Sequence, residues 1–129
     1  MNRSTTIAAW LAAFAAAVHL FAGTVVIHRP LLESALPEPL RLLLYVCWHL
    51  VSITLIGSAL VLFLAVRAKT PAHWINAVRG VGVLWIGFAL VFIGVGLVFS
   101  DPRALLVLPQ WILLLPVGLL ALAGKPAVR

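Results

Sequence analysis

Three polar side chains lie inside separate long apolar runs of this sequence: His19, His49 and Gln110. Each is nine or ten residues along the chain from a polar segment that separates two apolar runs. These polar segments are expected at the same membrane surface. With a rise of 1.5 Å per residue, each side chain lies roughly 13–15 Å along its helix from that surface. Polar groups are unfavourable at such depth and are often functional, so their common level predicts a site.

The residue types in this layer suggest two kinds of ligand. Two neutral imidazoles could ligate a haem iron or another metal, which makes His19 and His49 candidate ligands of a non-covalent haem b. Zinc would need a third strong ligand, and the apolar runs contain no carboxylate. The alternative is a lipid, a quinone or another hydrophobic small molecule, held between aromatic walls by a few polar groups. The predicted ligand-binding residues are His19, Trp48, His49, Ser52, Gln110 and Trp111.

The same side chains also admit a structural interpretation without any ligand. They could bond to one another or to backbone carbonyls and hold helices in register, at about 0.6 kcal/mol for each interhelical pair. The protein would then be a structural or accessory subunit. No Ser/His/Asp set, paired carboxylates or glycine-rich phosphate loop is present, so no catalytic residue is predicted and enzyme activity stays undecided.

The composition points to lipid as the solvent that surrounds these residues. The chain has 129 residues, of which 64% are hydrophobic and 9% charged. A soluble domain of this length could not bury so much apolar surface. A helix needs about twenty apolar residues to cross the hydrocarbon core. Four runs are long enough, at about 7–27, 42–66, 81–99 and 104–123.

The connections between these runs are short, so neighbouring helices must run antiparallel. The sequence therefore predicts one all-α domain over residues 1–129, an up-down-up-down four-helix transmembrane bundle. The first connection is expected to begin at residues 28–30, where His28 and the nearby Glu33 form a second, weaker candidate site. A tight turn at 100–103 is expected to cap the fourth helix through Ser100 or Asp101, with Pro102 in its first turn.

Charge distribution predicts the orientation. The basic residues of one side outnumber those of the other and are Arg3, Arg67, Lys69, Arg79, Lys125 and Arg129. The positive-inside rule then places both termini in the cytoplasm of a cell with a bacterial-type inner membrane. The net charge of +6 is not concentrated in a basic run with interleaved aromatics, which argues against nucleic-acid binding. The first run resembles a signal peptide but continues to Ile27, so we expect a membrane span.

Small residues predict where helices approach one another, because close packing drives helix association in lipid. On the first helix, Ala12, Ala15 and Ala16 share the face of His19. The third helix has Gly80, Gly87 and Gly94 at intervals of seven, on a face that could pack inside the bundle or against a second copy. A homo-oligomer through this glycine face, and with it a minimal oligomeric transporter, is therefore a further possibility. Pro109 and Pro116 are expected to bend the fourth helix.

Overall fold

The computed structural model describes residues 2–99 and 103–125, except for the side chains of Pro71, Phe99 and Ala104. The predicted turn residues Ser100, Asp101 and Pro102 lie outside this range. Within it the chain is all-helical, as predicted, and has no strand. The elements are α1 (Arg3–Gly23), η1 (Thr24–His28), α2 (Arg29–Leu32), α3 (Glu38–Arg67), η2 (Pro71–Trp74), α4 (Ile75–Phe99), α5 (Ala104–Val107) and α6 (Trp111–Leu122).

Three stretches of helix in the described chain are long and apolar enough to cross a membrane. They are Arg3–Leu32, Glu38–Arg67 and Ala72–Val98, and each contains nearly all of one predicted run. Large apolar side chains cover their outer faces; Phe21, for example, is 77% exposed and Ile53 is 67% exposed. Exposed apolar faces of this extent are typical of surfaces that contact a membrane or another protein.

The first helix is longer than predicted, because it does not end at residues 28–30. A π-helical turn, η1, follows α1, and the helix continues through Pro30 to Leu32. In this turn the Arg29 N–H bonds to the carbonyl of Thr24, five residues earlier. Such a local change of register lets a helix accommodate a proline, which lacks the N–H that the regular pattern requires. The first connection is therefore confined to residues 33–37.

The predicted fourth run is helical but interrupted. The short helix α5 ends at Val107 and α6 begins at Trp111, with residues 108–110 between them outside any helix. Pro109 accounts for the break, because its ring disfavours helical geometry in the preceding residue and it offers no backbone donor. Pro116, by contrast, lies within α6. At 12 residues, α6 is about 18 Å long, too short to cross a bilayer alone.

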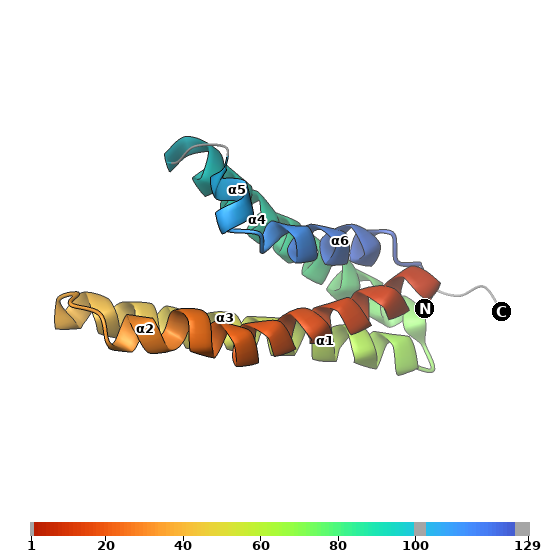
Figure 1. Ribbon diagram of the computed structural model, residues 1–129. Helices are drawn as coiled ribbons and strands as arrows, with labels where there is room; N and C mark the ends of the chain where they lie inside the picture. The colour runs from red at the N-terminus through yellow and green to blue at the C-terminus, as the bar shows by residue number, and fades with distance from the viewer. Residues whose placement is uncertain (1, 100–102, 126–129) are drawn as a thin grey trace.

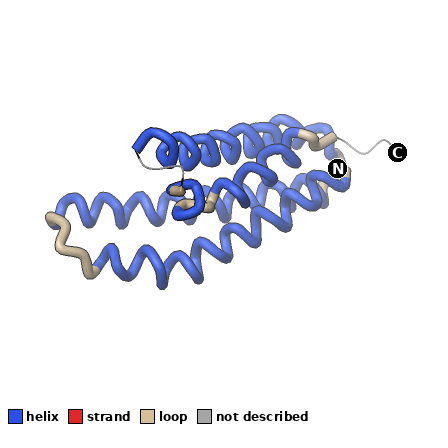
Figure 2. The backbone as a smooth tube through the Cα atoms, turned by 45° about the horizontal axis from the view of Figure 1, so that its top comes forward, coloured by secondary structure: helices blue, strands red, loops and turns tan. Residues whose placement is uncertain are grey.

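The helices form two antiparallel pairs, α1 with α3 and α4 with α6. The pairs meet where α1 packs against α6, and they diverge toward the opposite end, so that the molecule resembles a V (Figure 1). The start of α1, the end of α6 and the α3–α4 connection lie at the closed end (Figures 1 and 2). The open end therefore separates the α1–α3 pair from the break between α5 and α6.

Hydrogen bonds at the closed end hold the two ends of the chain together. The Asn2 side chain accepts a bond from the N–H of Thr5 and donates one to the carbonyl of Ala123. The Asn2 N–H also donates to the carbonyl of Lys125, at 3.1 Å. Because α1 begins beside the end of α6, the described part of the chain passes along the long axis of the molecule an even number of times.

Close packing at this end uses small residues, although not the glycines that were predicted. Alanines of α1 are buried in the core, and α4 approaches α6 where Gly82 meets Gly118. A Cβ on Gly118 would lie 2.9 Å from the carbonyl oxygen of Gly82. The predicted glycine face is different: a Cβ on Gly80, Gly87 or Gly94 would meet no atom of the described chain within 4 Å.

Candidate functional site

A cleft of about 580 Å³ lies between the two helix pairs, near the point where they diverge. We call it the central cleft. Its walls come from α1, η1, α3, α4, the break at residues 108–110, and α6. Nearly all of its lining side chains are apolar, and the polar exceptions are His19, Trp48 and Gln110. A second hollow of about 400 Å³ shares these three residues and extends to Leu31 and Cys47.

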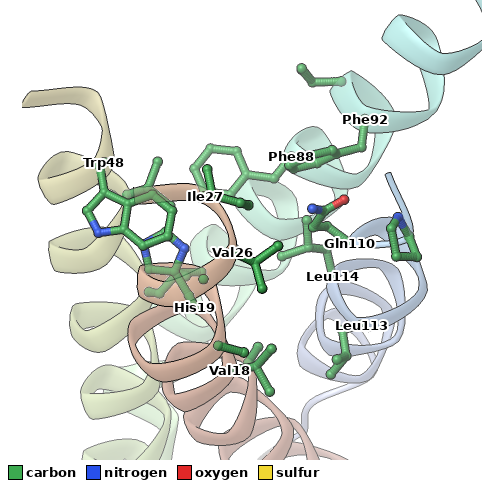
Figure 3. Close-up of a pocket in the computed structure, with 17 residues that line it drawn as sticks. Val18, His19, Val26, Ile27, Trp48, Phe88, Phe92, Gln110, Leu113 and Leu114 are labelled. Atoms are coloured by element: carbon green, nitrogen blue, oxygen red, sulfur yellow. The ribbon is translucent and has the colours of Figure 1, made fainter. Parts of the chain in front are cut away.

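His19 and Trp48 form one wall of the central cleft. Their rings stack at a centroid distance of 4.0 Å, with 21° between the planes. The His19 Nε2 lies 3.0 Å from the Oγ of Ser52, which lies one turn after Trp48 on α3. Figure 3 shows the imidazole beside the indole at the edge of the cleft. The His19 side chain thus projects from α1, and α3 holds its ring by a hydrogen bond and a stacking contact.

The opposite wall contains Gln110, directly before α6, with Phe88 and Phe92 of α4 (Figure 3). The Gln110 Oε1 is buried and has no hydrogen-bond partner among the residues that the structure describes. A buried polar atom without a partner is rare and calls for an explanation. The helix break places this residue at the start of α6, where its side chain borders the cleft.

Ser52 does not line the central cleft, although it was predicted to contact the ligand. Its side chain is only 6% exposed and lies between α1 and α3. The hydroxyl donates to the carbonyl of Trp48 at 2.9 Å. Ser52 therefore acts on the cleft through His19, whose ring it orients.

His49 is not brought to His19, and it does not line the cleft. It is exposed on α3, and its ring lies 4.6 Å from that of Tyr45 and 5.8 Å from that of His28. His28 also approaches Trp48, at 5.4 Å. A bis-imidazole haem site would need His19 and His49 to face one flat space, and this arrangement does not provide that. The second candidate site, His28, instead joins an aromatic cluster beside the cleft.

Trp111, also a predicted ligand-binding residue, connects the two halves of the interrupted fourth run. Its indole Nε1 donates to the carbonyl of Leu105 at 3.0 Å, and the residue does not line the cleft. This bond crosses the break and connects α6 to α5. It also satisfies one of the carbonyls that the end of a short helix leaves without a partner.

Some residues of the site were not predicted from the sequence. Phe88 and Phe92 were indistinguishable from other apolar residues of a spanning helix, so no signal could have identified them. Gly23 has a clearer role, because a Cβ there would come 2.5 Å from the Cη2 of Trp48. It follows His19 at helical spacing within a run of small residues, and this was the available signal.

The architecture defines an all-helical protein with three helices that could cross a membrane and a cleft between its helix pairs. Comparison of the chain with protein-family models, with curated proteins and with solved structures finds no match. Its function is therefore inferred from its own residues.

Proposed function

We propose that this chain is an integral membrane protein that binds a hydrophobic small molecule in the central cleft. The observation that carries this proposal is the placement of His19, beside Trp48, and of Gln110 on opposite walls of a cleft whose other lining side chains are apolar. Small-molecule sites typically have volumes of about 300–1,000 Å³, apolar walls and a few polar groups that orient the ligand. The cleft volume of about 580 Å³ lies within that range.

The proposed topology has four crossings, the fourth made by α5 and α6 together. Three long apolar helices, an even number of passes and the apolar outer faces support it. Irregular backbone at membrane depth is tolerated where it is buried in protein or lines a cavity. Residues 108–110 meet that condition, since Pro109 and Gln110 line the cleft. The excess of basic residues near the termini favours cytoplasmic termini and a bacterial-type inner membrane.

A lipid or a quinone suits this cleft better than haem does. The Nε2 of His19 is bonded to Ser52 and one face of its ring is covered by Trp48. His49 lies outside the cleft, so it cannot supply a second imidazole there. A flexible apolar ligand could enter from the surrounding bilayer between the diverging helix pairs. It could serve redox chemistry, transport or a larger complex.

A purely structural role competes with ligand binding. One observation favours the structural role, and another speaks against it. The His19–Ser52 bond joins α1 to α3, as a packing role requires. The Gln110 Oε1, however, bonds to no described residue and so contributes nothing to packing through a hydrogen bond. The packing role therefore leaves this buried acceptor unexplained.

Native mass spectrometry of the protein extracted in mild detergent tests the proposal. We expect a retained small molecule with the unmodified chain and a marked loss of it with His19→Ala or Gln110→Leu. His73→Ala is the matched control, because His73 is exposed on η2 and does not line the cleft. A chain that retains no molecule, or equal retention by all variants, would favour the structural role. Absorbance in the Soret region of the same sample tests haem.

Assembly through the predicted glycine face remains a separate proposal. Gly80, Gly87 and Gly94 have open space above them, which would let a second copy approach closely. Light scattering of the purified protein would measure its mass in solution. If this face joins two copies, Gly87→Leu should reduce the mass to that of one chain, and an unchanged mass would reject the interface.

A further inference from the structure

The hydrogen bonds around Ser52 determine which nitrogen of His19 carries the proton. The Ser52 Oγ lies 2.9 Å from the Trp48 carbonyl oxygen and 3.0 Å from the His19 Nε2. A carbonyl oxygen can only accept, so the single hydroxyl proton is used on Trp48. The hydroxyl oxygen must then accept from His19, which places the imidazole proton on Nε2.

This tautomer leaves the other ring nitrogen, Nδ1, as a hydrogen-bond acceptor. In a neutral imidazole one nitrogen donates and the other accepts. Turning the ring over would break the bond to Ser52, and the stacking of Trp48 further restricts the ring. Its partners on α3, Ser52 and Trp48, therefore determine that Nε2 is the donor of the His19 ring and Nδ1 the acceptor.

On the opposite wall, the Oε1 of Gln110 is buried and unpartnered, so a ligand in the cleft does not reach it as the side chain lies. Rotation of the Gln110 carboxamide could present its NH₂ group instead. His19, by contrast, has a ring whose orientation is held by two contacts. His19 lines the apolar cleft, and its Nδ1 stays unpaired there, which is unfavourable, unless a ligand brings a donor.

We propose that the ligand of the central cleft carries a hydroxyl group, alcoholic or phenolic, that donates a hydrogen bond to the His19 Nδ1. The proposal rests on the function proposed above and narrows its ligand class. Quinols and long-chain or isoprenoid alcohols satisfy it. Quinones, simple esters and hydrocarbons do not, because none of them has an O–H group that could donate.

A matched pair of probes tests this choice, with the full chain in phosphatidylcholine nanodiscs. Farnesol and farnesyl methyl ether share an apolar body and an oxygen, but only farnesol can donate. We expect farnesol to bind about tenfold more tightly, which is about 1.4 kcal/mol. Decylubiquinol and decylubiquinone form a second pair, which shows whether a phenolic hydroxyl is recognised as well.

The outcomes separate the two proposals. Equal binding within both pairs would overturn the hydroxyl requirement and leave a hydrophobic binding site. Failure of every probe to bind would overturn the proposed function itself. Tighter binding of farnesol or decylubiquinol than of its partner supports both proposals.

A spectroscopic readout tests the tautomer independently of any ligand. In protein labelled with ¹⁵N-histidine, the ring signals that vanish in His19→Gln belong to His19, and they should report a protonated Nε2. Ser52→Ala should weaken this preference and reduce the discrimination between the paired probes. Ser58→Ala is the matched control, because Ser58 is also buried on α3 but does not line the cleft. A protonated Nδ1 in the unmodified protein would overturn the inference.

Discussion

Gly23 lies against the indole of Trp48, so close that a Cβ at residue 23 would be 2.5 Å from the Cη2 of the ring. The glycine is where α1 ends and the π-helical turn η1 begins. Trp48 in turn stacks on His19. The wall of the central cleft therefore depends on the absence of a side chain at one position.

Gly23→Ala should displace the Trp48 ring and weaken ligand retention. The added methyl group cannot share space with the indole, so the ring must move and its stacking on His19 is lost. Tryptophan fluorescence and native mass spectrometry would measure the two effects. Gly57→Ala on α3 is the control, because a Cβ there meets no atom of the described chain within 4 Å. Retention that survives Gly23→Ala unchanged would show that the indole position is unimportant.

Gly118→Ala should destabilise the protein by about 1–3 kcal/mol, the range typical of overpacked cores. A Cβ at this position would lie 2.9 Å from the backbone of both Gly82 and Ile86, and backbone atoms cannot move aside as a flexible side chain can. Thermal unfolding in detergent would measure the loss. Gly57→Ala on α3, where a Cβ has open space, should leave the unfolding temperature almost unchanged. Equal unfolding temperatures for the two variants would contradict the observed packing of α4 on α6.

His49→Ala should leave ligand retention intact, in contrast to His19→Ala. His49 is exposed and lies with Tyr45 and His28, away from the cleft lining. Native mass spectrometry of the two variants side by side makes the comparison. If both lose the ligand to the same extent, then the two histidines do act together, as the sequence alone suggested.

Trp111→Phe should loosen α5 while the ligand is still retained. The substitution keeps an aromatic ring but removes the donor to the Leu105 carbonyl, an interhelical bond worth about 0.6 kcal/mol on average. Hydrogen exchange of residues 104–107 should become faster. Loss of the ligand without faster exchange would mean instead that Trp111 contacts the ligand.

Much of the fold followed from local patterns. Long apolar runs predicted an all-helical chain, and three helices long enough to cross a membrane contain the first three runs. The helix bounds were less accurate, because they depend on prolines whose effect varies with context. Pro30 is accommodated by a π-helical turn, whereas Pro109 interrupts a helix.

The site was predicted only in part, for a related reason. Depth along a helix can be counted from the sequence, and this brought His19 and Gln110 to one level. The side of the helix on which a residue faces its neighbours, by contrast, depends on how each pair of helices packs. The structure places His19 and Gln110 at the cleft but leaves His49, Ser52 and Trp111 outside its lining.

By itself, then, the sequence determined the hydrophobic character of the chain, its helices and the depth of its polar residues, all of which are properties of single segments. The tertiary structure decided which side chains meet. The Gly82–Gly118 contact joins α4 to α6, while Gly23 and Trp48 join α1 to α3. Where two helix pairs pack tightly within themselves and touch at one end only, a cleft must remain between them, and no single segment encodes it.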